Sequence, residues 1–173
     1  MLVEARFSTL LFDLLTAEEE RVDQVNLAFR FDIELLGRRL VAVTDWISTR
    51  ADTRHLPVGY FGASTGAAAA LIAAAERPER VAAVVSRGGR PDLAERVLPA
   101  VQAPTLLIVG SLDVPVIAMN RRALDALTAE KKLEIVPGAS HLFEEPGTLE
   151  IVARLASHWF RRHLRAPRVA GSV

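Results

Sequence analysis

Short apolar runs alternate along the chain with longer segments of helical periodicity, and this alternation predicts the fold. Runs of four or five mostly apolar residues are typical of buried strands, whereas apolar residues three or four positions apart are typical of amphipathic helices. The predicted strands are residues 8–12, 58–61, 81–85, 105–109 and 133–136. The predicted helices are approximately residues 32–49, 65–77, 91–98, 115–127 and 147–164.

The repeating order of strand and helix predicts a single α/β domain over residues 1–173. Strands joined through helices pair in parallel by right-handed crossovers, and such sheets carry helices on both faces. Two segments depart from this pattern. The acidic residues 16–30 are expected to form a loosely folded connection, and the Pro- and Gly-containing residues 166–173 a flexible tail. We therefore expect about five mostly parallel strands between two layers of helices.

Composition excludes several classes of function. The 21 basic and 21 acidic residues are interleaved and give a formal net charge of zero, so no basic patch for nucleic acid is expected. The longest apolar stretch, residues 67–75, is too short to span a membrane. The absence of cysteine excludes disulfides and thiolate metal sites, and residues 1–7 lack the features of a signal peptide. We therefore expect a soluble cytoplasmic protein.

One pentapeptide carries the strongest chemical signal. Gly62-Ala63-Ser64-Thr65-Gly66 follows a predicted strand and opens an alanine-rich helix, the layout of a nucleophile elbow. In such a turn the serine backbone is strained and its hydroxyl is exposed above the sheet. We expect glycine on both sides because a Cβ there would collide with the neighbouring strand and helix. The alternative is a tight turn that uses small residues for packing alone.

An acidic residue and a histidine follow two later strands. Ligands of an open parallel sheet bind beyond the carboxyl ends of its strands, which is where Ser64, Asp113 and His141 are expected. A serine hydroxyl needs an imidazole to take its proton and a carboxylate to orient that imidazole. The order Ser, Asp, His therefore predicts a catalytic triad. The alternatives are that Asp113 only caps the following helix and that His141 is an ordinary loop histidine.

Several segments together resemble the α/β-hydrolases, and most closely the dienelactone hydrolase-like group. Besides the elbow, residues 103–110 before Asp113 and residues 138–144 around His141 resemble the acid and histidine segments of that family. The resemblance implies carboxylic ester hydrolysis, with the Thr65 amide as one donor of the oxyanion hole. Dienelactone hydrolases proper use cysteine as the nucleophile, and this chain has serine at the matching position.

The chain also departs from the family at its start. Residues 8–12 resemble the fourth strand of the family, so the first three strands and the loop that supplies the second oxyanion donor have no counterpart. We expect residues 8–12 to pair directly with residues 58–61 or to be exchanged between subunits, and an unpaired edge there to favour a homodimer. The second donor is expected from the backbone near residues 13–15 or from a partner subunit.

A few other polar residues are candidates for a function. Arg87 follows the third predicted strand and could bind a substrate carboxylate, although a surface role together with Arg90 is the simpler interpretation. No chemistry is assigned to the remaining histidines or to the adjacent acids of the histidine loop, namely His55, His158, His163, Glu144 and Glu145.

The sequence thus favours a carboxylesterase-type serine hydrolase of small, short-acyl esters that needs no metal or organic cofactor. No phosphate-binding or zinc motif is present. Three alternatives stay open: a non-catalytic remnant with an incomplete oxyanion hole, an acyltransferase that uses the same acyl-enzyme, and a fragment of a longer hydrolase.

Overall fold

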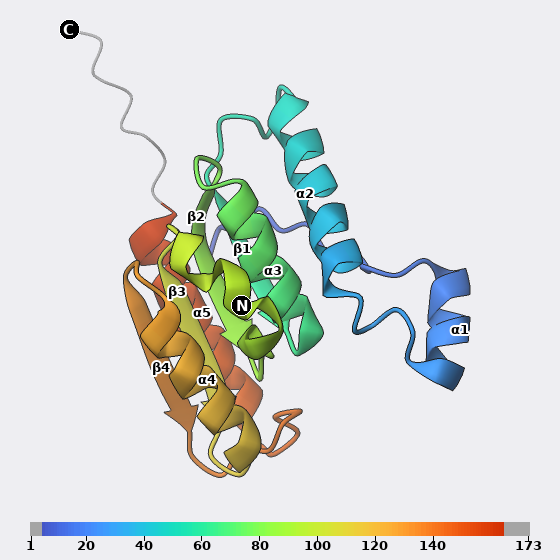
Figure 1. Cartoon of the computed structure of the whole chain (residues 1–173). Coiled ribbons are helices and arrows are strands. Elements are labelled where there is room, and N and C mark those ends of the chain that lie inside the picture. The colour runs from blue at the N-terminus through green and yellow to red at the C-terminus, as the bar shows by residue number, and fades with distance from the viewer. Residues whose placement is uncertain (1–4, 165–173) are drawn as a thin grey trace, which may run out of the picture.

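The centre of the molecule is a parallel sheet of four strands (Figure 1). The computed structural model describes residues 5–164. The strands run in the order β1-β2-β3-β4, with every neighbouring pair parallel, so their carboxyl ends lie at one edge of the sheet. The strands are β1 (Val58–Ala63), β2 (Val81–Arg87), β3 (Thr105–Gly110) and β4 (Lys131–Val136).

Helices cover both faces of this sheet, as expected. One buried cluster joins the strands to α2, α3, η1 and α4, and a second cluster joins them to α5 on the opposite face. Successive β2 residues alternate between the two clusters, Val84 facing the first and Ala83 and Val85 the second. The helices are α2 (Ile33–Thr49), α3 (Thr65–Glu76), η1 (Pro91–Ala100), α4 (Val114–Ala126) and α5 (Thr148–His163).

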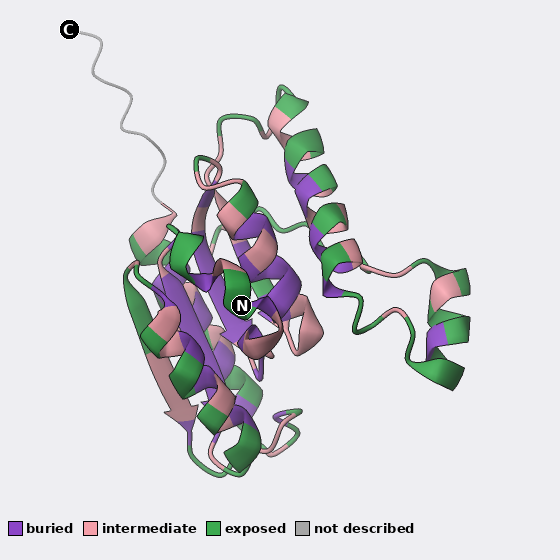
Figure 2. Cartoon of the chain, in the orientation of Figure 1, coloured by how far each residue is buried: buried purple, intermediate pink, exposed green. Residues whose placement is uncertain are grey.

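The alanine-rich α3 is the most deeply buried helix. Residues 67–71 are at most 1% exposed, and Figure 2 shows α3 buried along most of its length. Small side chains let the helix axis approach the sheet closely, which fixes the first turn of α3 relative to β1. Because α3 starts directly after Ser64, this packing determines where that residue lies.

The first predicted strand is wrong. Residues 8–12 form no strand, and among the described residues β1 pairs only with β2. The segment instead crosses the free edge of β1: Phe7 packs edge-on against Phe160 on the α5 side, whereas Leu14 packs into the cluster on the α3 side. Leu11 between them is 96% exposed. The free edge of β1 offers unpaired backbone groups, but the segment passes across that edge from one face of the sheet to the other, so no ladder of hydrogen bonds forms.

The acidic connection is more ordered than expected. Within residues 16–30 the chain forms α1 (Ala17–Asn26), which begins with a capping box. The Thr16 hydroxyl accepts from the Glu19 amide at 3.3 Å, and the Glu19 carboxylate accepts from the Thr16 amide at 2.8 Å. Figure 1 shows α1 lying apart from the sheet, beside the start of α2.

The other differences are small. The segment predicted as a helix at 91–98 is the 3-10 helix η1 with a kink at Ala94, and β4 begins two residues earlier than expected. The tail at 166–173 lies outside the described residues. Across residues 5–164, no helix has the length and apolar character needed to cross a membrane.

Candidate active site

Ser64 lies in a strained turn between β1 and α3, as the sequence predicts. Its backbone has φ 49° and ψ −123°, a region that residues other than glycine rarely adopt. Its side chain makes no capping hydrogen bond to α3, so the hydroxyl is not used to start the helix. This is the geometry expected of a nucleophile elbow.

The two glycines of the elbow are not equivalent. A Cβ at Gly62 would lie 2.6 Å from the Gly66 carbonyl oxygen and 2.7 Å from the Ala67 Cα, so only glycine fits there. A Cβ at Gly66 would meet only the Leu14 Cδ1 atom, at an ordinary 3.9 Å. The expectation that both glycines are sterically required therefore holds at Gly62 and is wrong at Gly66.

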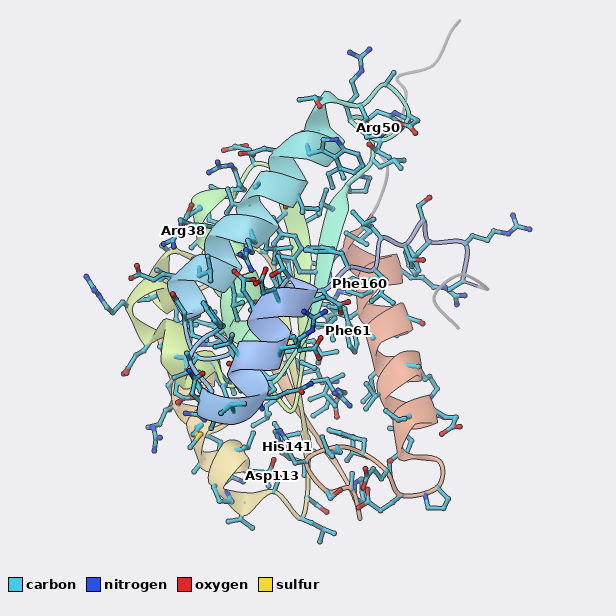
Figure 3. The ribbon with its side chains drawn as sticks, turned by 90° about the vertical axis from the view of Figure 1, so that its right-hand side faces the viewer. Arg38, Arg50, Phe61, Asp113, His141 and Phe160 are labelled. Atoms are coloured by element: carbon cyan, nitrogen blue, oxygen red, sulfur yellow. The ribbon has the colours of Figure 1, made fainter. Side chains whose placement is uncertain are left out.

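Asp113 and His141 are in direct contact at the carboxyl end of the sheet. The Asp113 Oδ2 and His141 Nδ1 atoms are 2.6 Å apart, and Figure 3 shows the two side chains facing each other. Asp113 occupies the N-cap position of α4, but its side chain makes no capping bond, so its carboxylate is directed to the imidazole. The Asp113 side chain is 14% exposed and that of His141 41% exposed, which leaves the far side of the imidazole accessible.

The loop that carries His141 is held by one of its own acids. Glu145 accepts a hydrogen bond from the Ser140 amide at 3.0 Å, and this bond lowers the pKa of the Glu145 carboxyl. Glu144 is exposed. The two adjacent acids thus differ in surroundings, and Glu145 has a structural contact.

The turn at residues 87–90 joins the elbow to the histidine. The Ser64 amide donates to the Arg87 carbonyl at 3.3 Å, and the Arg90 amide donates to the Ser64 carbonyl at 3.1 Å. The same turn lies close to the histidine, since a Cβ added at Gly88 would be 3.5 Å from His141 Nδ1. Within residues 5–164 no hydrogen bond within 3.5 Å joins Ser64 directly to His141, and the loose Ser–His geometry of an unliganded site is common.

Ser64 opens into a pocket whose outer wall the sequence did not reveal. The volume of this pocket is about 460 Å³. Besides Ser64 and Thr65 it is lined by residues 13–15 and by residues of α1, of the connection to α2 and of the first turn of α2: Glu20, Asp23, Arg30, Phe31 and Leu36. The capping-box pattern in residues 16–19 was a readable signal for α1, but no signal in the sequence indicated that α1 lies near Ser64.

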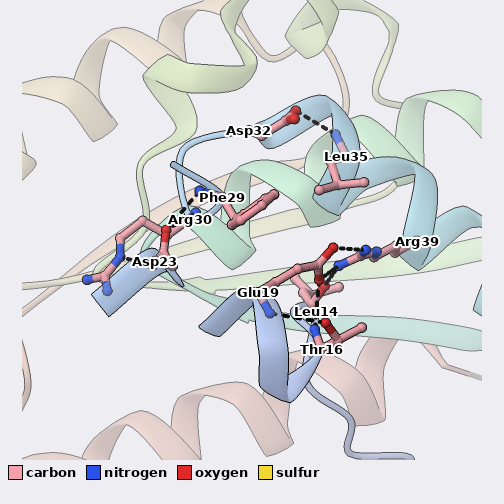
Figure 4. Close-up of polar contacts among 9 residues, drawn as sticks. All are labelled: Leu14, Thr16, Glu19, Asp23, Phe29, Arg30, Asp32, Leu35 and Arg39. Atoms are coloured by element: carbon pink, nitrogen blue, oxygen red, sulfur yellow. Dashed lines mark hydrogen bonds and ion pairs between the residues drawn. The ribbon is translucent and has the colours of Figure 1, made fainter. Parts of the chain in front are cut away.

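An ion pair attaches α1 to the body of the protein (Figure 4). Arg39 of α2 donates to both carboxylate oxygens of Glu19, each at 2.6 Å, and to the Leu14 carbonyl at 2.7 Å. The hydrogen bond from Arg39 lowers the pKa of Glu19 to about 2. One arginine therefore holds both the start of α1 and the peptide that precedes it.

A buried aspartate closes the turn after α1. Asp23 is 2% exposed and accepts hydrogen bonds from the amides of Phe29 and Arg30, each at 2.8 Å, and from the Arg30 guanidinium. Burial acts to raise the pKa of Asp23, but these hydrogen bonds outweigh it and the pKa is lowered. Asp23 thus orders the turn that brings Arg30 and Phe31 to the pocket.

Arg87 lies on the other face of the sheet. Its guanidinium donates to the Leu142 carbonyl at 3.2 Å and lies over the Phe143 ring, 5.6 Å from the ring centre, and burial lowers its pKa. It lines a separate, mostly apolar cavity of about 410 Å³, together with Phe61, Leu149, Glu150, Val152, Ala153 and Ala156. Arg87 and Ser64 are therefore backbone neighbours whose side chains line different cavities, and a substrate-binding role for Arg87 stays a prediction.

The remaining histidines lie away from this site. His55 is exposed in the loop before β1, and His163 lies at the end of α5, with its ring centre 4.5 Å from that of Trp159. In the described part of the chain, no group of three or more histidine, aspartate or glutamate side chains could hold a metal ion.

A family model and a solved structure both match this chain and name the same protein family. The model of the Dienelactone hydrolase family matches residues 10–164. The crystal structure of dienelactone hydrolase from Anabaena variabilis is 64% identical, with a TM-score of 0.92 over 95% of this chain and 76% of that one. A monoacylglycerol lipase from Paleococcus ferrophilus is 17% identical, with a TM-score of 0.63 over 76% of each chain, and shows the fold alone.

A curated relative carries a different name. A Mycobacterium tuberculosis protein named "Putative phosphoribosyl transferase" is 60% identical over 171 residues, which are 99% of this chain and 38% of the relative. The chain thus spans less than half the length of that relative, and the name describes the longer protein.

Proposed function

Because the chain belongs to the dienelactone hydrolase family, we propose that it is a serine hydrolase that cleaves carboxylic esters with Ser64, His141 and Asp113. The observation that carries the proposal is the 2.6 Å contact between Asp113 and His141 at the sheet edge where Ser64 occupies a strained elbow. Family membership supports hydrolase chemistry, and the roles of the three residues are the proposal.

Each residue has one chemical role in the proposed reaction. The Ser64 hydroxyl oxygen bonds to the ester carbonyl carbon while its proton passes to His141 Nε2, and that proton then leaves with the alcohol. Water adds to the acyl-serine in the same way, releases the acid and restores the Ser64 hydroxyl. Asp113, bonded to Nδ1, keeps the imidazole in the tautomer that accepts at Nε2 and stabilises its positive charge.

The oxyanion formed at the carbonyl needs hydrogen-bond donors. The Thr65 amide is the first proposed donor, since it directly follows the nucleophile. Residues 13–15 line the same pocket as Ser64 and Thr65, which supports their backbone as the source of the second donor in place of a partner subunit. In a structure of the phosphonylated protein, we expect the Thr65 amide and one amide of residues 13–15 about 3 Å from the phosphoryl oxygen. An oxygen bound by Thr65 alone would refute the second assignment.

The pocket supports small ester substrates. Its apolar lining from Leu14, Leu15 and Leu36 is mixed with charged side chains at Asp13 and Glu20, which disfavours burial of a long alkyl chain and supports a short acyl group. We expect esters of two to four acyl carbons to be hydrolysed faster than a twelve-carbon ester. Equal kcat/KM values for the acetyl and twelve-carbon esters would contradict this preference.

The decisive experiment is reaction with a fluorophosphonate, followed by intact mass measurement on the wild-type protein and on Ser64→Ala. A single adduct on the wild-type protein and none on Ser64→Ala is expected, because phosphonylation requires an activated serine. Folded wild-type protein that forms no adduct would instead support a non-catalytic remnant.

Acyl transfer is the second candidate, because an acyl-serine reacts with any nucleophile that reaches it. Product analysis of the ester reaction in the presence of an added alcohol or amine separates the two. Free acid as the main product would support hydrolysis. An acylated alcohol or amine as the main product would support acyl transfer instead.

A further inference from the structure

A polar side chain of α4 is buried against the turn at residues 87–90. Asn120 is 0% exposed and lies on α4, seven residues after Asp113. Its Nδ2 group donates to the Val116 carbonyl of its own helix at 2.8 Å and to the Gly89 carbonyl at 3.0 Å. The Asn120 amide orientation follows from these partners, because an oxygen in place of Nδ2 would face two carbonyl oxygens.

The bond to Gly89 ties Asn120 to the turn that touches two proposed triad residues. Residues 87 and 90 bond the Ser64 backbone on both sides, and Gly88 lies against the His141 imidazole. The turn is itself tightly packed: a Cβ at Gly89 would lie 1.9 Å from the Ser86 hydroxyl oxygen. The close packing and the hydrogen bond from Asn120 to the Gly89 carbonyl therefore leave this turn little room to move.

Asn120 also belongs to the element that carries the third triad residue. α4 begins directly after Asp113, and the Ile117 amide donates to the Asp113 carbonyl at 3.0 Å. The Asn120 side-chain amide thus joins the helix that follows Asp113 to the turn that contacts Ser64 and His141. The Arg87 side chain adds a link from the same turn to the histidine loop through the Leu142 carbonyl.

We infer that Asn120 is a positioning residue of the proposed hydrolase: it holds the 87–90 turn against α4 so that Ser64, His141 and Asp113 keep their mutual alignment. The inference rests on the proposed function and adds to it a residue that touches neither the substrate nor the triad side chains. Its physical basis is that a displacement of about 1 Å among reacting groups can lower the rate by about 100-fold.

The test compares variants by ester hydrolysis with p-nitrophenyl acetate and by the rate of fluorophosphonate labelling. Asn120→Leu has a similar volume and no donor. Asn120→Ser keeps a hydroxyl that can bond the Val116 carbonyl four residues earlier but is too short to reach Gly89. The matched control is Thr105→Val, which removes a buried hydrogen bond of 2.9 Å from the Thr105 hydroxyl to the Ala103 carbonyl, outside the site.

For both Asn120 variants we expect kcat to fall at least ~10-fold with KM changed less than ~3-fold, and labelling to slow in parallel. Thr105→Val is expected to lower the Tm to a similar extent and to leave kcat within ~2-fold. Rates are measured at a temperature where circular dichroism shows each variant folded, and Asn120→Ser serves if Asn120→Leu does not fold.

The outcomes separate this inference from the proposed function. A kcat of the folded Asn120 variants within twofold of wild type, or an equal loss of kcat in Thr105→Val, would overturn the positioning role while ester hydrolysis by the wild type stood. Wild-type protein that neither hydrolyses the ester nor reacts with the fluorophosphonate would overturn both.

Discussion

At the scale of single residues, the candidate site depends on close contacts that restrict which side chains fit. Ser64 has a backbone conformation that its neighbours enforce, and Gly62 has no space for a Cβ. The elbow, Asp113 and His141 could be predicted because each follows a strand end and each residue type has a distinct role. The contacts of Arg39 and Asn120 could not, since each side chain bonds a backbone carbonyl distant in sequence.

The glycines of the elbow should respond oppositely to alanine. Gly62→Ala forces a Cβ onto the backbone of residues 66 and 67 and should lower the free energy of unfolding by about 1–3 kcal/mol and abolish labelling of Ser64. Gly66→Ala lies in open space near the start of α3 and should keep full labelling, with stability unchanged or raised by up to about 1 kcal/mol. Thermal denaturation and fluorophosphonate labelling check both, and equal behaviour of the two variants would contradict the steric argument.

Asp113→Asn should test whether Asp113 sets the tautomer of His141, because this substitution keeps the shape of the side chain. The substituted amide would donate to His141 Nδ1 and leave the wrong tautomer, so kcat should fall on the order of 10³–10⁴-fold with KM little changed. Asp125→Asn, on the exposed surface of the same helix, is the control and should leave kcat unchanged. Steady-state kinetics on p-nitrophenyl acetate measures both, and a loss of less than tenfold in Asp113→Asn would argue against a triad.

At the scale of elements, the sequence correctly predicted the strands and helices whose packing partners lie close to them in the chain. The four paired strands and their helices follow from local periodicity and short connections. Residues 8–12 have the same apolar character as the real strands, yet form none because pairing depends on a neighbouring strand that the pattern cannot specify. For α1 the reverse holds: its polar composition suggested a loop, and the capping box with the ion pair to Arg39 makes it a helix.

The attachment of α1 should depend on pH through Glu19. Its pKa is lowered from 4.5 to about 2 by Arg39, so the stabilisation is complete above pH 4.5 and is lost as the pH falls toward 2. The protection of residues 17–26 against hydrogen exchange, measured relative to the intrinsic exchange rate at each pH, should therefore fall over that interval. Arg39→Met should give fast exchange of α1 already at pH 7, whereas Arg38→Met, which removes only an exposed 4.0 Å contact to Glu34, should not. Equal exchange in the two variants at pH 7 would refute the anchoring role of Arg39.

At the scale of the whole molecule, the free edge of β1 is a weakly protected surface. The strand has no charged residue, Phe61 within it is 44% exposed, and the crossing segment beside it exposes Leu10 and Leu11. Natural sheets usually cover or charge such an edge. Within the described residues nothing pairs with it, so the edge is a surface that favours association.

We propose that this edge makes the isolated chain self-associate, as the sequence suggested. Sedimentation velocity should show a concentration-dependent dimer, and Leu11→Lys should shift the equilibrium toward monomer without loss of secondary structure. A matched change at another exposed leucine, Leu112→Lys in the turn after β3, should leave the equilibrium as it is. A wild-type protein that stays monomeric across the accessible concentrations would overturn this proposal.

The two helices beside the Ser64 pocket differ in how much sequence variation they can accept. In α3 seven residues are buried, so nearly every larger side chain would displace the turn that carries Ser64. In α1 only Asp23 is buried, and the other positions can change without disturbing the sheet. Mutational drift and laboratory evolution should therefore change the α1 wall of the pocket, while the α3 wall that carries Ser64 stays unchanged.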